Sequence, residues 1–357
     1  MSTIMQNQMI IEKIFKQKVC NIQKNILDND KDSITNKVSF GKPSIYKYNI
    51  QLKNGTKKSF VGKWKSKKII INGIKLISGN DMKMAIMLAK NHKVFGFNQS
   101  HLREMIFYKN VDTPLNKYLI KTLGYYRNKI TDTYFIAMNY VSDSKKITAG
   151  DLTKIIDGIT DFHKIYYNSP TAINKLCLNH YERKDYRRAK KVLSVMFDKL
   201  DDSNQKIFGL DKTFKIKIFI QNIENEYQKV LFHQTLTHND FSPRNIFLKD
   251  EKICFYDWEL ACYQNPEHDL IELLVSVMHE LNDSEIKMLI EYFKEVLLRK
   301  LDINIDDKQY FKIIKFNVLE YTVNRLTLLR MADKKLKLKF ISQMTWNISR
   351  LMDILDI

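Results

Sequence analysis

The apolar and polar positions of this chain follow two different periods. Between residues 45 and 65, apolar side chains at every second position predict a strand, and an Asn-Gly pair predicts a tight turn and a returning strand. Another strand pattern covers residues 132–141. From Leu152 the apolar spacing is that of helices, and it stays mostly helical to the last residue. We therefore expect a strand-rich part in residues 1–141 and a helix-rich part in residues 142–357.

Two lysines and one acid stand out in the strand-rich part. The returning strand places Lys63 and Lys65 on the same face, because side chains alternate between the two faces of a strand. A helical pattern then covers residues 81–110. Within it, Ser100 is the expected N-cap of a helix that carries Glu104.

The richest group of polar side chains lies in THNDFSPRNIFLKDEKICFYDWELA, residues 237–261. Its second half predicts a hairpin of two short strands joined by a KDE turn. The hairpin brings Asn245, before its first strand, and Asp257, after its second, to the same end. Oxygen ligands without thiolate or imidazole suit Mg²⁺, which usually takes substrate phosphates and water as its other ligands. Asp240 is then free to orient a hydroxyl group and accept its proton.

Composition narrows the class of partner. With 357 residues, 44% of them hydrophobic, the chain is long enough for one large domain or two lobes. Its formal net charge of +19 would suit an anionic partner such as a nucleotide, a nucleic acid or a membrane surface, but the excess is spread along a chain that is generally rich in Lys, Ile and Asn, which favours a general bias in composition. The densest basic run, residues 182–191, contains acids and accompanies no nucleic-acid motif, so a solvated helix face is favoured.

The compartment is also suggested by composition. The four cysteines lie far apart and form no C-x-x-C pair, which favours a reducing, cytoplasmic setting over a zinc site or a disulfide framework. The first twenty residues predict a packed amphipathic helix and not a signal sequence. No apolar run approaches the roughly 18 residues that a membrane span requires.

Two motifs carry a resemblance to a known family. HNDFSPRN at residues 238–245, followed by YDWE at residues 256–259, resembles the Brenner motif and the metal-binding Asp of the aminoglycoside phosphotransferase and choline kinase superfamily, relatives of the protein kinases. The HND and DWE forms are most similar to the choline-kinase-like branch. The resemblance implies an α+β, two-lobed, protein-kinase-like fold. Residues 1–141 would form a small N-lobe with an antiparallel sheet, and residues 142–357 a larger, mainly helical C-lobe.

The resemblance also implies a nucleotide site in the N-lobe. Lys63, in preference to Lys65, would hold the α- and β-phosphates, and Glu104 would position that lysine. Gly41 would lie in the phosphate loop SFGKPS, which has fewer glycines than such loops usually carry. Asn139 would lie at the hinge that meets the adenine edge. The choline-kinase branch often has Arg where Lys63 stands, which weakens assignment to that branch.

In the C-lobe the resemblance makes Asp240 the catalytic base or hydroxyl-orienting group. Asn245 and Asp257 would be the Mg²⁺ ligands. For Glu259 two roles stay open, namely a contact with a second Mg²⁺ or support of Asp257.

Several neighbouring residues are expected to have structural roles. His238 would tie the catalytic loop to nearby backbone, and Arg244 would pair with a nearby acid, with contact to a phosphate as the alternative. Asp269 is expected to cap the helix that follows it. His163 and His279 lie on apolar helix faces and are expected to be buried.

The expected activity is transfer of the γ-phosphoryl group of ATP, with Mg²⁺, to a hydroxyl of a small molecule such as an amino alcohol or amino sugar. A protein kinase is disfavoured, because the chain after Asp257 passes quickly into a helix without an A-P-E-like segment. A nucleotide-binding pseudokinase and a basic nucleic-acid binder are two further hypotheses. The sequence does not determine the acceptor, because fold does not fix substrate.

Overall fold

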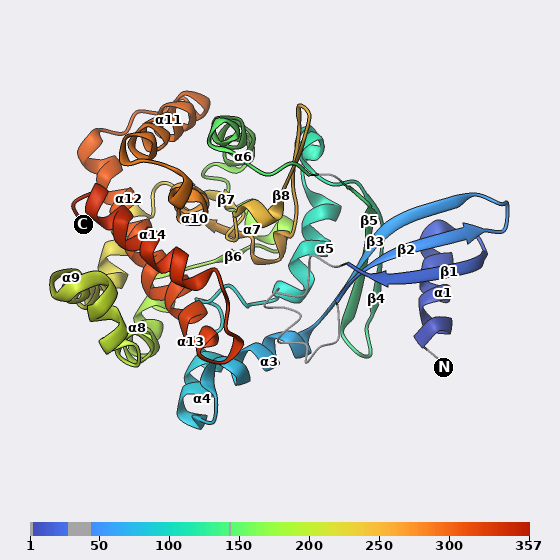
Figure 1. The fold of residues 1–357 in the computed structure, drawn as a ribbon, viewed down its shortest axis with the longest axis horizontal. Helices are drawn as coiled ribbons and strands as arrows, with labels where there is room; N and C mark the ends of the chain where they lie inside the picture. Colours follow the sequence, from blue (N-terminus) through green and yellow to red (C-terminus); the bar gives the residue numbers. More distant parts are fainter. Residues whose placement is uncertain (1–2, 28–43, 143) are drawn as a thin grey trace.

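A computed structural model describes residues 3–27, 44–142 and 144–357 of the chain (Figure 1). The first part contains a five-stranded antiparallel sheet in the order β1-β2-β3-β5-β4. Its strands are β1 (Val19–Ile26), β2 (Ile45–Leu52), β3 (Lys57–Ser66), β4 (Thr122–Asn128) and β5 (Thr133–Asn139).

The predicted hairpin is confirmed in β2 and β3, which pair from Ile45–Lys63 to Gln51–Lys57. The strand predicted at residues 132–141 is β5, while β4 was not predicted. Helix α1 (Thr3–Phe15) lies against the sheet, so the predicted N-terminal helix is also confirmed (Figure 1).

Three helices link the sheet to the rest of the molecule. α4 (Met82–Lys90) and α5 (Ser100–Asn110) occupy most of the range in which helix was predicted. The N-cap of α5 is Gln99 and not Ser100, so that prediction was wrong by one residue. α3 (Lys67–Ser78) was not predicted, because its β-branched run and internal Asn-Gly pair are typical of strands and turns.

The second part is mainly helical, as predicted. Helix α9 is interrupted at Gly209, where a φ of 75° departs from helical geometry. The helices are α6 (Leu152–Tyr166), α7 (Thr171–Leu176), α8 (Arg183–Asp198), α9 (Asp201–Val230), α10 (Glu267–Val277), α11 (Asp283–Leu301), α12 (Asp307–Tyr321), α13 (Thr327–Leu336) and α14 (Ile341–Ile354).

Two small sheets lie among these helices. The hairpin predicted from the polar stretch is formed by β8 (Ile246–Lys249) and β9 (Lys252–Phe255). The other sheet has the order β6-β10-β7. Its strands are β6 (Asn179–His180), β7 (Thr235–Thr237) and β10 (Cys262–Gln264).

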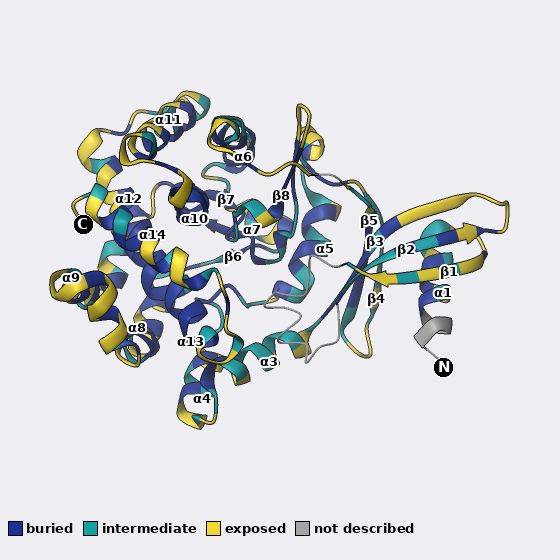
Figure 2. Cartoon of the chain, in the orientation of Figure 1, coloured by how far each residue is buried: buried dark blue, intermediate teal, exposed yellow. Residues whose placement is uncertain are grey.

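The described residues form three hydrophobic clusters, and the two largest stabilise the two parts. The larger one fills the helical part and includes Trp258, which is fully buried. The smaller one lies between α1 and the sheet and includes Ile10, Tyr48 and Phe60. Figure 2 shows the contrast between these buried segments and the exposed outer strands and helices. The predicted α+β architecture, with an antiparallel sheet and a helical remainder, is therefore confirmed.

Two further sequence predictions concern Gly41 and the boundary between the two parts of the chain. Gly41 lies outside the described residues. The division predicted between residues 141 and 142 falls in the connection from β5 to α6. Among the helices described, none has the length and apolar character needed to span a bilayer.

Candidate active site

Buried acids of α10 hold the HNDFSPRN loop, which runs from β7 to β8. The carboxylate of Asp269 accepts hydrogen bonds from the backbone N–H of His238 at 2.9 and 3.0 Å and from that of Asn239 at 3.1 Å. Glu272 accepts a hydrogen bond from the backbone N–H of Phe241 at 2.6 Å. Charged acceptors make strong hydrogen bonds, so these contacts fix the loop on α10.

The prediction that Asp269 caps a helix is wrong. Asp269 lies inside the first turn of α10, after the N-cap Pro266, and its carboxylate faces the loop and not the helix end. The reason is that the loop offers N–H groups that only the folded chain brings within reach of this side chain.

Two of the three histidine predictions are confirmed. His238 has a structural contact, because its Nε2 lies 2.9 Å from the backbone oxygen of Tyr256. His163 is fully buried, with its Nε2 3.0 Å from an oxygen of Asp269. The prediction for His279 is wrong: it lies in a short 3₁₀ turn after α10 and is exposed.

Asp240 is surrounded by hydrogen-bond donors. Arg244 donates from Nη2 to its two oxygens at 2.8 and 3.0 Å, and Arg325 donates to Oδ1 at 2.8 Å. The side-chain amide of Asn245 donates to Oδ2 at 2.9 Å. Burial by itself would raise the pKa of Asp240, but the two guanidinium groups outweigh it and hold the pKa below its usual value. The predicted pairing of Arg244 with an acid is confirmed, whereas Arg325 was not predicted.

Lys63 lies between two carboxylates from different parts of the chain. Its Nζ is 2.7 Å from an oxygen of Glu104 in α5 and 2.6 Å from an oxygen of Asp257. Burial alone would lower the pKa of Lys63, but these acids raise it well above its usual value. Burial would raise the pKa of Asp257, and the Lys63 ammonium reverses this and lowers it. Lys63 is thus the lysine next to Glu104, as the resemblance implied.

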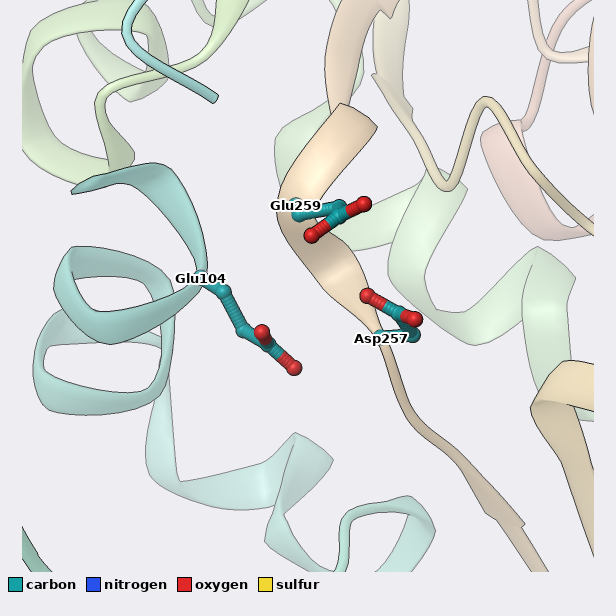
Figure 3. Close-up of side chains that lie close together, drawn as sticks. All are labelled: Glu104, Asp257 and Glu259. Atoms are coloured by element: carbon teal, nitrogen blue, oxygen red, sulfur yellow. The ribbon is translucent and has the colours of Figure 1, made fainter. Parts of the chain in front are cut away.

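Three carboxylates converge beside this lysine. Glu104, Asp257 and Glu259 offer oxygen atoms that all lie within 4.8 Å of one another. Figure 3 shows the three side chains, Glu104 on a helix and the other two on a separate segment. Glu259 forms an ion pair with Lys65. Donors of this kind, all oxygen, are those that Mg²⁺ prefers, so the residues present fit that ion.

One cleft of about 810 Å³ brings the predicted residues together. Asn139, predicted for the hinge, lies on its wall at the end of β5. Asn245 also lines it, and its amide N–H groups bond to the backbone and side chain of Asp240, which leaves its carbonyl oxygen for a cation. The predicted residues that line the cleft are Lys63, Glu104, Asn139, Asp240, Asn245, Asp257 and Glu259.

Arg103 supports this site and was not predicted. It is fully buried next to Glu104 in the sequence, and its guanidinium donates to the backbone oxygens of Glu259 at 2.6 Å and Cys177 at 2.9 Å. It therefore fixes the backbone of the segment that carries two of the three carboxylates. No local sequence signal distinguishes such an arginine from a solvated one, because its partners are backbone oxygens.

Residues 161–302 match the model of the phosphotransferase enzyme family. The match lies within the helical part and covers less than half of the whole chain. None of the curated proteins matches the chain by sequence. The matched segment includes the loop with Asp240 and the hairpin that leads to Asp257, so the resemblance based on these motifs is confirmed there.

Solved structures resemble the chain over nearly its whole length. The GDP complex of aminoglycoside 2'-phosphotransferase-IIIa is 11% identical, with a TM-score of 0.50, and the match covers 98% of this chain and 99% of that one. Choline kinase from Cryptosporidium parvum Iowa II is 11% identical, with a TM-score of 0.49 and coverage of 93% and 88%. A putative fructosamine-3-kinase from Haemophilus somnus 129PT is 10% identical, with a TM-score of 0.48 and coverage of 97% and 96%. At this level of identity the first match identifies the fold, which is the predicted kinase-like one.

Proposed function

We propose that this protein transfers the γ-phosphoryl group of ATP to a hydroxyl group of a small molecule. The observation that carries the proposal is a single cleft in which the Lys63–Glu104 ion pair lies beside Asp257, and which Asp240 and Asn245 also line. A lysine held by an acid, a carboxylate-rich metal site and a separate carboxylate for the acceptor are the parts that phosphoryl transfer requires. Residues 1–141 would form the nucleotide-binding lobe and residues 142–357 the catalytic lobe, in a cytoplasmic protein.

In the proposed reaction the acceptor oxygen attacks the γ-phosphorus, the bond from that phosphorus to the β,γ-bridging oxygen breaks, and ADP leaves. The hydroxyl proton passes to Asp240 or to water as the new bond forms. Lys63, positioned by Glu104, would bind the α- and β-phosphates, and Asn139 would meet the adenine edge.

Mg²⁺ would be held by Asn245, Asp257 and Glu259. When bound, it supplies positive charge beside the β- and γ-phosphates. The ion pair with Lys63 lowers the pKa of Asp257 and so keeps this carboxylate in the ionised state that binds a cation, and Glu259 pairs with Lys65 beside it. Gly41 is part of the proposed phosphate loop.

The decisive experiment is Asp240→Asn. We expect phosphoryl transfer to fall by at least about 100-fold, because general base and orienting groups contribute about 10²–10⁴-fold, while ATP binding changes little. Transfer is measured over a panel of amino alcohols, amino sugars, polyols and hydroxy acids, and ATP binding by calorimetry.

Asp250→Asn is the matched control for this experiment. Asp250 is exposed at the β8–β9 turn, and its φ of 50° is one that Asn accepts readily. Equal transfer rates in Asp240→Asn and wild type would refute the role of Asp240. ATP binding without transfer to any acceptor, in the wild type, would instead favour a nucleotide-binding pseudokinase. Transfer to protein hydroxyls alone would favour a protein kinase.

A further inference from the structure

The carboxylate of Asp240 has no room for a further hydrogen bond in this structure. Its Oδ1 accepts bonds from Arg244 and Arg325, each at 2.8 Å, and its Oδ2 accepts from Arg244 at 3.0 Å and Asn245 at 2.9 Å. An ionised carboxylate offers about four lone-pair positions, and four bonds occupy them. An acceptor hydroxyl can therefore bind Asp240 only if one of these donors leaves.

Arg325 is the donor whose position is most unusual. It lies in a π-helical segment, Thr322–Leu326, between α12 and α13. Such segments are rare and frequently occur at functional sites. The side chain of Arg325 is 16% exposed and faces the cleft, so its charge is partly shielded from water. If it released Asp240 without a new anion, a largely buried charge would be left unpaired, which is costly.

The charge at this end of the cleft is positive. Among the described residues that line the cleft, Arg244 and Arg325 both pair with Asp240, and the neighbouring acid Asp257 is paired with Lys63. Glu272 lies behind them, buried, and its carboxylate accepts from the backbone of Phe241. A cationic acceptor would meet two guanidinium groups and no unengaged carboxylate among these residues. An anionic acceptor group would meet two planar donors that match the geometry of a carboxylate or phosphate.

An apolar wall lies next to the two arginines. It consists of Leu328, Leu329 and Ala332 on α13 and of Phe340, whose ring centroid is 5.8 Å from the guanidinium of Arg244. An acceptor bound here would present its charged group to the arginines and an apolar or aromatic body to this wall.

We propose that the acceptor carries an anionic group, a carboxylate or a phosphate, and that Arg325 binds this group when it leaves Asp240. The bond from Arg325 to Oδ1 breaks, a bond from Arg325 to the acceptor anion forms, and the freed Oδ1 accepts the acceptor hydroxyl. No charge is left unpaired, because the arginine exchanges one anion for another. This inference rests on the proposed phosphotransferase function and adds the substrate class to it: hydroxy acids or hydroxyl-bearing phosphate esters.

The test compares acceptors that have the same hydroxyl and differ in charge. They are 4-(hydroxymethyl)benzoate, 4-(hydroxymethyl)phenyl phosphate, the neutral 4-(hydroxymethyl)benzamide and the cationic 4-(hydroxymethyl)benzylamine. We expect kcat/KM with ATP to be about 10- to 100-fold higher for an anionic compound than for the amide, which corresponds to one charge-assisted contact. The values of kcat/KM for the benzoate and for the phosphate ester, compared with each other, identify which anion is preferred. A higher value for the amide or the amine than for both anions would overturn the proposal.

The variant Arg325→Gln tests the residue. We expect Arg325→Gln to reduce the ratio of kcat/KM for the anionic compound to kcat/KM for the amide to near one. Arg325→Lys should retain part of this preference, and Arg188→Gln should leave the ratio unchanged. Arg188 is an exposed arginine of α8 and serves as the matched control. An unchanged ratio in Arg325→Gln would overturn the proposal. So would a raised KM for ATP with an unchanged acceptor ratio, because Arg325 would then serve the nucleotide.

Binding of 4-(hydroxymethyl)benzoate, measured by calorimetry on the full chain without nucleotide, gives a readout besides turnover. We expect Arg325→Gln to weaken this binding by about tenfold or more, and thermal unfolding establishes that the variant is folded. Anion binding that depends on Arg325, without transfer to any compound, would support the anion site and refute the phosphotransferase function. Transfer to all four compounds at equal rates would support the phosphotransferase function and refute the anion site.

Discussion

Asp269 shows how a single residue takes its role from distant parts of the chain. Its position before an apolar helical run is typical of a cap, yet its carboxylate binds the N–H groups of His238 and Asn239 and contacts His163. These partners lie 30 to 106 positions away in the sequence. The local pattern therefore predicted the helix correctly and the role of the acid wrongly.

Asp151 is an acid whose local contacts give a pH prediction. It completes a capping box with Thr148 before α6 and accepts a hydrogen bond from Lys145 at 2.7 Å. Burial opposes ionisation, but these donors outweigh it and lower the pKa of Asp151 to about 2, from 3.8. A lowered pKa stabilises the fold above the unfolded-state value, and this stabilisation is lost as the pH falls from about 4 to about 2.

We expect Asp151→Asn to lower the free energy of unfolding by about 1 kcal/mol at pH 7, because the group is close to solvent and its ion pair is screened. The difference in the free energy of unfolding between Asp151→Asn and wild type should vanish as the pH approaches 2. Urea unfolding between pH 7 and pH 2 measures it, with Asp250→Asn as the control that should change stability little. A difference that stays constant over this pH range would show that the lowered pKa of Asp151 does not stabilise the fold.

At the scale of elements, the site depends on both faces of strand β3. One face presents Lys63 and Lys65 to the acids of the cleft, while the other presents Phe60 to the cluster beneath α1. Gly62 lies on the second face, where the rings of Tyr48 and Phe135 come close to its backbone. The position of Lys63 therefore depends on how tightly these aromatic rings pack against the strand.

We expect Gly62→Ala to destabilise the protein by about 1–3 kcal/mol, because a Cβ at this position would lie 2.5 Å from ring carbons of Tyr48 and Phe135. Gly73→Ala in α3 is the matched control. No described atom lies within 4 Å of a Cβ there, so the change should raise stability by about 0.5–1 kcal/mol through helix propensity. Urea unfolding measures both, and unchanged stability in Gly62→Ala would show that the rings can move aside.

At the scale of the whole molecule, the cleft joins the sheet to the helical part. The ion pair between Lys63 and Asp257 connects positions 194 residues apart, and the helix α5 contributes Glu104 between them. A nucleotide bound in the cleft would contact both parts at once. Its binding should therefore stabilise both hydrophobic clusters and not the helical one alone.

We expect ATP with Mg²⁺, at about 100 times its Kd, to raise the free energy of unfolding by about 2.7 kcal/mol. Variants that keep only Trp64, which packs against the sheet cluster, or only Trp258, in the larger cluster, should report the same shift by fluorescence. Lys63→Met should remove most of this increase in the free energy of unfolding. Lys146→Met changes a lysine that is 81% exposed and should leave the increase unchanged. A shift seen by Trp258 alone would contradict a cleft that joins both parts.

Much of the fold and of the site is visible in local patterns. The alternation in β2 and β3, the Asn-Gly turn and the β8–β9 hairpin involve residues close in sequence, so short-range periodicity predicts them. The motif residues Asp240, Asn245 and Asp257 lie on one loop and one hairpin, and for that reason their proximity was predictable. Strand β4 and helix α3 were missed, because packing against the rest of the fold overrides their weak or misleading local signals.

By itself, the sequence determined the kinase-like architecture, the resemblance of residues 161–302 to the phosphotransferase enzyme family, and seven of the residues that line the cleft. Only the tertiary structure decided that Asp269 anchors the loop, that Arg103 holds the backbone of Glu259, and that Arg325 reaches Asp240 from 85 residues away. The physical reason is that hydrogen bonds and ion pairs depend on distances of about 3 Å in space. A sequence predicts such distances within a hairpin or a helical turn, but not between elements that meet only when the chain folds.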